Sequence, residues 1–186
     1  MADMQLLVKR ALDGAAVWHR SQNRKYPHVE VPYISHSAGV VFVLGRHQFD
    51  DEVVAAGALH DVMEDCGVTY ETLEDSFGPR VADLVRAVSE PDKTVSWEAR
   101  KADYLDRFAH AAWDAQAIAV ADKIDNFLSI AVCARDHGNP WTMFRRGRTT
   151  QLAYFSQFIR HAEAARSHPL IDELRDAFRA VAILEG

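Results

Sequence analysis

The sequence has few of the features that mark secreted or membrane-embedded proteins. Its two cysteines, Cys66 and Cys133, are too few for a disulfide framework and lack the spacing of a zinc site. The longest run without a charged or strongly polar side chain covers eight residues, 38–45, whereas a membrane-spanning helix needs about 20. The N-terminus lacks a basic-then-apolar signal pattern. These absences predict a protein of the reducing cytoplasm that has no membrane segment.

An excess of positive charge is also absent, because the net charge is −6 and the pI is about 5.8. This balance argues against a broad surface for duplex DNA or RNA. An acidic protein that binds an anionic ligand needs a local basic patch or a cation held by its carboxylates. We therefore expect a small-molecule partner and no nucleic acid, and the sequence leaves open whether the chain forms a homo-oligomer.

The apolar residues follow a helical period almost throughout, and no sustained period-two pattern or hairpin signal interrupts it. Apolar residues make up 48% of the chain and charged residues 26%, as in ordinary globular domains. Ser35, Asp50 or Asp51, Thr69 and Ser96 are candidate helix caps. The sequence therefore predicts an all-α fold, a single domain over residues 1–186, with about eight or nine helices that include segments 4–20, 35–47, 52–65, 115–135, 141–165 and 169–184.

The first candidate site is the pair His60 and Asp61, followed one helical turn later by Glu64 and Asp65. The preceding residues, 53–59, are apolar, so four ionisable groups crowd one edge of a helix that we expect to be buried. A solvated acidic helix end would account for Glu64 and Asp65, but not for a His-Asp pair within an apolar run. The pattern therefore favours a catalytic or metal-binding role for these residues.

Asp122 lies in the most hydrophobic helix that the sequence predicts, with Asn126 one turn further on. A charged group in such a setting must be paired or bound to a metal, and a buried ion pair is the alternative to a metal. His36, at the start of the second predicted helix, is by itself more often structural than a ligand. Considered together, however, three predicted helices supply four side chains that could bind one divalent ion: His36, His60, Asp61 and Asp122.

These nitrogen and oxygen donors without thiolate suit Mn²⁺, Fe²⁺ or Zn²⁺ better than Ca²⁺ or a cysteine-type zinc site. Glu64 and Asp65 would lie next to a water activated by the ion, and a carboxylate there can take its proton. Basic residues form two clusters, Arg24 and Lys25 before His36, and Arg145, Arg146 and Arg148 late in the chain. Lysine and arginine side chains are usually exposed to solvent without a ligand. The functional alternative is that these clusters contact the phosphates and the base of a nucleotide.

Several segments together resemble a known family, the HD-domain metal-dependent phosphohydrolases, and within it the hydrolase domain of the RelA/SpoT homologues and the small alarmone hydrolases. The resemblance depends on Arg24 and Lys25 upstream of His36, on His60 and Asp61 followed by Glu64 and Asp65, and on Asp122 with Asn126. It covers residues 24–126, with helical character alone beyond them. The paired Glu and Asp one turn after the His-Asp pair make the match more specific than that pair alone.

The resemblance implies an all-α fold with one Mn²⁺ and hydrolysis of guanosine 3′-diphosphate 5′-di- or triphosphate, (p)ppGpp, to GDP or GTP and pyrophosphate. It implies that His36, His60, Asp61 and Asp122 are ligands and that Glu64 and Asp65 position or activate water. It further implies substrate contacts for Arg24 and Lys25 at the guanine, for Asn126 at the nucleoside, and for Tyr154 at phosphate. Thr150 stands where small hydrolases carry an arginine, so Arg146 or Arg148 is the expected substitute.

Two other functions stay open from the sequence. One is an HD-type phosphohydrolase for another nucleotide, such as a nucleoside mono- or triphosphate or a phosphorylated dinucleotide. The other is a non-catalytic nucleotide-binding module, against which Glu64 and Asp65 argue because a pure binder does not need water-activating carboxylates. The Arg24 and Lys25 loop favours the alarmone over other nucleotides.

Overall fold

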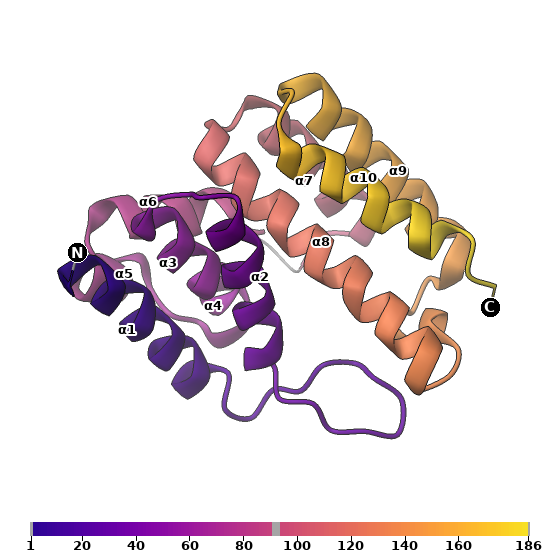
Figure 1. Ribbon diagram of the computed structural model, residues 1–186, viewed down its shortest axis with the longest axis horizontal. Helices are drawn as coiled ribbons and strands as arrows, with labels where there is room; N and C mark the ends of the chain where they lie inside the picture. Colours follow the sequence, from indigo (N-terminus) through magenta and orange to yellow (C-terminus); the bar gives the residue numbers. More distant parts are fainter. Residues whose placement is uncertain (1, 91–93, 186) are drawn as a thin grey trace.

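The computed structural model of the protein describes residues 2–90 and 94–185. Within these residues all regular structure is helical (Figure 1), apart from one isolated antiparallel bridge between Asn23 and Pro32. The N-terminal half comprises α1 (Ala2–Trp18), α2 (Ile34–Arg46), α3 (Asp51–Leu59), α4 (Val62–Cys66), α5 (Tyr70–Phe77) and α6 (Pro79–Val88). The C-terminal half comprises α7 (Trp97–His110), α8 (Trp113–Asp136), the short 3₁₀ helix η1 (Pro140–Met143), α9 (Gly147–Ala165) and α10 (Pro169–Ala182). The all-α prediction is confirmed.

Helix α8 is the axis of the molecule (Figure 1). Helices α2, α3 and α6 pack against it from one side and α10 and α7 from the other, while α9 packs on α7 and α10. The sequence explains this central position, since α8 carries apolar residues on nearly its whole circumference. Its fully buried Ile118, Ile124 and Phe127 join Leu44 and Leu59 in the core. The polar residues Asp122 and Lys123 in the middle of α8 are therefore largely shielded from solvent.

Most helix starts follow local signals in the sequence. The side chain of Asp50 accepts hydrogen bonds from the backbone N–H groups of Glu52 and Val53, and Thr69 and Ser96 cap α5 and α7 in the same way. Ser35 does not act as the predicted cap, because α2 begins one residue earlier and its N-cap residue, Tyr33, makes no side-chain cap hydrogen bond. The Tyr33 side chain instead donates a hydrogen bond to Asp61, at the site described below.

Two segments that the sequence predicts as single helices are divided in the structure. The segment 52–65 is α3 and α4, with His60 and Asp61 as the turn between them. Both residues keep right-handed backbone angles, φ −54° and ψ −31° for His60, and φ −101° and ψ −4° for Asp61. Segment 141–165 is divided into η1 and α9 by extended Phe144 and by Gly147 at φ 67°, which glycine adopts without steric cost. Long-range contacts of the side chains override the helical period at the first of these breaks.

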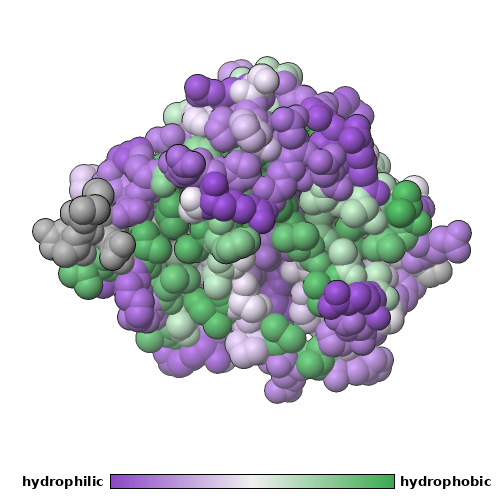
Figure 2. All heavy atoms as spheres, in the orientation of Figure 1, coloured by the Kyte–Doolittle hydropathy of each residue, from purple (hydrophilic) through white to green (hydrophobic). Residues whose placement is uncertain are grey.

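The face formed by α2, α8 and α10 carries exposed apolar side chains among polar ones (Figure 2). Phe42, Leu128 and Val132 are 66%, 46% and 38% exposed. An open groove of about 580 Å³ lies on this face, lined by Arg46, His47, Leu128, Glu173, Asp176 and Ala177. None of the helices in the described ranges is long and apolar enough to cross a membrane.

Candidate metal centre

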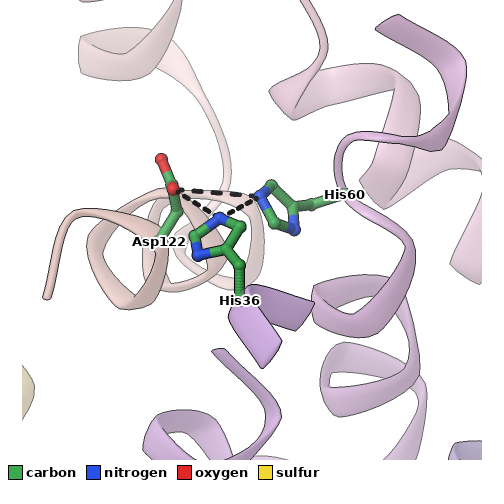
Figure 3. A group of neighbouring side chains, drawn as sticks. All are labelled: His36, His60 and Asp122. Atoms are coloured by element: carbon green, nitrogen blue, oxygen red, sulfur yellow. Dashed lines mark hydrogen bonds and ion pairs between the residues drawn. The ribbon is translucent and has the colours of Figure 1, made fainter. Parts of the chain in front are cut away.

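Three helices that are distant in sequence bring two imidazoles and a carboxylate together (Figure 3). His36 lies in the first turn of α2, His60 follows α3, and Asp122 lies in the middle of α8. The Nε2 atoms of the two histidines are 3.3 Å apart. Asp122 Oδ1 is 3.2 Å from His36 Nε2 and 3.8 Å from His60 Nε2. The three donor atoms therefore face one point, as ligands of a single ion do.

The outer nitrogen of each ring has its own acceptor, which determines where the ring hydrogen lies. His60 Nδ1 is 2.9 Å from the Gly57 carbonyl oxygen, and a carbonyl only accepts, so Nδ1 carries the hydrogen. His36 Nδ1 is 2.6 Å from Asp125 Oδ2 and donates to it. Both Nε2 atoms thus face Asp122. When a divalent cation binds between these atoms, it takes the place of any hydrogen on Nε2, and each ring donates its Nε2 lone pair to the cation.

Electrostatics at this point also favours a positive charge. Burial alone would lower the pKa of His60, but the Asp61 and Asp122 carboxylates raise it to about 9. Burial opposes ionisation of Asp122 as well, yet Lys123 and the two imidazoles hold its pKa well below the usual range. The donor set therefore fits a divalent ion, which would take the place of a proton here.

Asp61 lies at the edge of this cluster. Its Oδ2 atom is 3.0 Å from His60 Nε2 and 3.9 Å from His36 Nε2. The same oxygen accepts a hydrogen bond from the hydroxyl of Tyr33, a partner that the sequence did not reveal. Burial and the Asp61 charge raise the pKa of this phenol far above its usual value, so it remains a hydrogen-bond donor. Tyr33 thereby orients Asp61 toward the histidines.

The two predicted catalytic carboxylates follow on α4. Glu64 Oε2 accepts a hydrogen bond from the backbone N–H of Glu90 at 3.3 Å and is partly buried. Asp65 is exposed, and its Oδ2 accepts from Gln22 Nε2 at 2.9 Å. Because α4 starts directly after Asp61, both carboxylates lie within one turn of the candidate ligands.

Arg24 and Asn126 are joined directly to the cluster. Arg24 Nη2 donates to Asn126 Oδ1 and to Ser129 Oγ, each at 3.0 Å, and Asn126 Nδ2 donates to Asp122 Oδ1 at 2.5 Å. The guanidinium of Arg24 also lies 5.7 Å from the ring centre of Tyr33. Lys25, the next residue along, is exposed. Two of the predicted nucleoside contacts therefore border the metal centre.

The late residues that the resemblance pointed to lie in different surroundings. Tyr154 on α9 is buried, with its ring 5.8 Å from that of Trp97, and burial raises its pKa to about 12. Arg146 is partly exposed and pairs with Glu98 at 2.7 Å. Arg148 donates from Nε and Nη2 to the carbonyl oxygens of Leu184 and Ala182, each at 2.8 Å. Its guanidinium thus stabilises the end of α10 by satisfying its carbonyl groups.

Sequence reasoning missed two partly buried cations beside the metal centre, Lys101 and Lys123. Together with Tyr154, which the resemblance did indicate, we call them the lysine cluster. Lys123 Nζ is 2.5 Å from Asp122 Oδ2, so one oxygen of Asp122 faces the imidazoles while the other faces a cation. Lys101 Nζ lies 5.3 Å from the ring centre of Tyr154 and pairs with Glu90. Burial and the neighbouring Lys123 lower the pKa of Lys101, whereas Asp122 raises that of Lys123 despite its burial.

A signal for the lysine cluster was present in the sequence. Lys123 follows Asp122 directly, and Lys101 lies within residues 24–126, which the resemblance covers. Neither position differs locally from a solvated helix lysine, which is the usual state of this residue. Only burial and the facing carboxylates distinguish them.

The match of the chain to known proteins extends over this whole region. The family model described as the HD domain matches residues 11–141, which include all four candidate ligands. The guanosine-3′,5′-bis(diphosphate) 3′-pyrophosphohydrolase of Drosophila melanogaster is 37% identical over 137 residues, covering 73% of this chain and 74% of that protein. The human protein of the same name is 36% identical over 125 residues, covering 66% and 69% of the two chains.

Two solved structures share the fold. One, described as a metazoan orthologue of SpoT that hydrolyses ppGpp, superposes with a TM-score of 0.81 at 30% identity and covers 96% of this chain and 97% of its own. The other, from Listeria monocytogenes EGD-e, has a TM-score of 0.73 at 34% identity and covers 79% of this chain and 98% of its own. The similarity therefore includes the helices beyond residue 126, where the sequence alone indicated only helical character.

Proposed function

This chain belongs to the HD-domain family, among the relatives of the small alarmone hydrolases, and we propose that it hydrolyses (p)ppGpp at the centre formed by His36, His60, Asp61 and Asp122. The reaction removes pyrophosphate from the 3′ position and leaves GDP or GTP. The observation that carries the proposal is the convergence of His36, His60 and Asp122 from three helices beside the lysine cluster. We also propose that the protein acts in the cytoplasm, where thiols such as those of Cys66 and Cys133 stay reduced.

We propose Mn²⁺ as the ion, since two imidazole nitrogens and carboxylate oxygens without thiolate suit it. A divalent ion supplies two things at such a centre, a water of lowered pKa and a Lewis acid for the phosphoryl group. The protein contributes the geometry, because Gly57 and Asp125 hold the two rings and Tyr33 holds Asp61.

Glu64 and Asp65 are the groups that move protons in this proposal. The oxygen of the attacking water forms a bond to the phosphorus attached to the ribose 3′-oxygen, and the bond between that phosphorus and the 3′-oxygen breaks. Glu64 takes a proton from the water and then gives it to the leaving 3′-oxygen, which becomes the 3′-hydroxyl. Asp65, held by Gln22, orients the water. General acid–base groups of this kind contribute about 10²–10⁴-fold to a rate.

The substrate contacts divide between the two sides of the centre. Arg24 and Lys25 border the guanine, with Asn126 at the nucleoside. The lysine cluster faces the phosphates, and Arg146 extends this positive region toward solvent. Fixed cations are required there, because a crowded diphosphate carries several negative charges and the protein as a whole has a net charge of −6.

The decisive experiment is a nucleotide panel with purified protein and Mn²⁺, with products separated by ion-exchange chromatography. The tetraphosphate ppGpp is expected to yield GDP and pyrophosphate, and the pentaphosphate to yield GTP and pyrophosphate. Inorganic phosphate as the first product would contradict the proposed bond cleavage. Cleavage of a simple nucleotide without reaction of ppGpp would assign the chain to another nucleotide substrate.

A further inference from the structure

The imidazole of His36 is held at both nitrogens by carboxylates of the same helix. Asp122 Oδ1 lies 3.2 Å from Nε2, on the side of the metal centre, and Asp125 Oδ2 lies 2.6 Å from Nδ1, on the opposite side. Asp125 is three residues after Asp122 on α8, so both project toward α2. Asp125 therefore contacts the ligand ring without facing the ion.

The position of Asp125 depends on a glycine one turn after His36. A Cβ atom built on Gly39 would lie 1.8 Å from Asp125 Oδ1 and 2.6 Å from its Cγ atom. Any other residue at position 39 would displace the carboxylate from His36. Glycine weakens a helix interior by about 0.5–1 kcal/mol relative to alanine, so the space at Gly39 has a cost in helix stability and gives Asp125 access to the ring.

The Asp125 carboxylate is partly shielded from solvent and lies beside a guanidinium. Its side chain is 14% exposed, and Arg24 Nη2 lies 4.0 Å from the Oδ2 atom that accepts from His36. A carboxylate at Nδ1 holds the ring hydrogen there, which leaves the Nε2 lone pair directed at the ion and increases its basicity. His60 receives the corresponding support from the backbone carbonyl of Gly57.

We propose that Asp125 is a positioning residue that, in the space left by Gly39, fixes the orientation and tautomer of His36 for metal binding. The inference depends on the proposed metal centre, but it concerns a residue outside the ligand set. Asp125 touches neither substrate nor reacting atoms, and its proposed effect on the metal passes through His36, although Arg24 lies beside the same oxygen. The two histidine ligands then differ in kind, since one is supported by the backbone and the other by a replaceable side chain.

The test compares Asp125→Ala, Asp125→Asn and Gly39→Ala in the full chain, with Asp136→Ala as the matched control. Asp136 lies on the same helix and pairs only locally with Arg135. Mn²⁺ affinity is measured by isothermal titration calorimetry. Loss of such a supporting group typically costs about 10- to 100-fold in affinity, which we expect for Asp125→Ala and Gly39→Ala. Asp125→Asn should lose less, because its amide oxygen still accepts from Nδ1.

A second readout separates positioning from a merely structural role. Long-range ¹⁵N NMR on the metal-free protein, recorded at a pH at which the ring is neutral, reports which nitrogen of His36 carries the hydrogen. The parent and Asp125→Asn should hold it at Nδ1, whereas Asp125→Ala and Gly39→Ala should show a mixture of tautomers. Because Gly39→Ala acts by displacing Asp125, adding it to Asp125→Ala should weaken Mn²⁺ binding little further.

The proposal is overturned if folded Asp125→Ala binds Mn²⁺ as tightly as Asp136→Ala does, or if its His36 remains in the Nδ1–H form. A folded Asp125→Ala result stands even if Gly39→Ala fails to fold. Absence of Mn²⁺ binding by the parent chain would refute the metal centre, and hence the proposed function, while the NMR measurement would still decide whether Asp125 sets the tautomer.

Discussion

The metal centre and the lysine cluster adjoin at Asp122, yet they are built in opposite ways. In the metal centre, the groups that turn away from the ion have partners, such as Gly57 for His60, Asp125 for His36 and Tyr33 for Asp61. In and around the lysine cluster, by contrast, the buried Tyr154 hydroxyl and Arg100 Nε have no hydrogen-bond partner among the described residues. A metal site must hold its ligands in one geometry, whereas a phosphate site must offer free donors.

The largest effect is expected from removing one of the proposed ligands of the metal centre. Asp61→Ala should abolish both Mn²⁺ binding and turnover, because His60 loses the carboxylate 3.0 Å from its Nε2 atom. Metal analysis of the purified variant and a ppGpp assay measure the two losses. Full metal occupancy in this variant would remove Asp61 from the ligand set.

A smaller effect is expected beside the ligands. Glu64→Gln should retain Mn²⁺ but lose about 10²–10⁴-fold in kcat, since the amide cannot accept the proton of the water. The glutamine has nearly the same shape, and its amide oxygen can still accept a hydrogen bond from the backbone N–H of Glu90. Metal content and kcat are measured on the same preparation. Turnover at the parent rate with metal bound would exclude a catalytic role for Glu64.

A substitution in the lysine cluster should leave the stability of the protein unchanged but weaken its activity. A buried hydroxyl without a partner costs about 1–3 kcal/mol, so Tyr154→Phe should unfold no more easily than the parent in urea. The same change removes a donor to phosphate and should raise KM for ppGpp about tenfold, or roughly 1.4 kcal/mol.

Tyr70→Phe is the control for that experiment, because Tyr70 also bears a hydroxyl but bonds to Asp83 away from the site. We expect its KM to match that of the parent. If Tyr154→Phe lost stability and kept its KM, the hydroxyl would be a structural group, and the contrast between the two regions would no longer hold.

The smallest effect on activity is expected at Arg148, whose hydrogen bonds go to Leu184 and Ala182. Arg148→Met should leave KM unchanged and lower the stability by about 1 kcal/mol, which is a Tm shift of about 2–4 °C for a chain of this size. Thermal unfolding and a KM measurement check both statements. A raised KM without a change in Tm would return Arg148 to the phosphate contacts.

Much of the metal centre was predictable, because ligand residues in apolar helices stand out in a sequence. Asp122 in an apolar helix and His60 with Asp61 after an apolar run had to be paired or bound to a metal. We grouped them with His36 because three predicted helices supplied groups that could hold one ion, and the structure brings His36, His60 and Asp122 together. Arg148 differs, since its place near other arginines suggested phosphate, whereas in the structure its guanidinium donates to the carbonyl oxygens of Leu184 and Ala182.

The lysine cluster and Asp125 could not be predicted in the same way. Lys101, Lys123 and Asp125 are charged residues on helices, and their local sequence is the same as that of solvated ones. In the sequence, Gly39 indicates only a residue that destabilises a helix. In the structure, the Asp125 carboxylate occupies the space that a Cβ atom on residue 39 would fill. Each of these roles depends on a helix that packs from elsewhere in the chain.

By itself the sequence determined the helical period, the caps at Asp50, Thr69 and Ser96, and which residues could bind a metal, because these properties depend on neighbours within about four positions. Only the tertiary structure decided which charge meets which partner. His36 and Asp125 are 89 positions apart, and Arg24 and Asn126 are 102 apart. Such contacts form when α8 is buried between two layers of helices, since burial forces each polar group on it to find a partner.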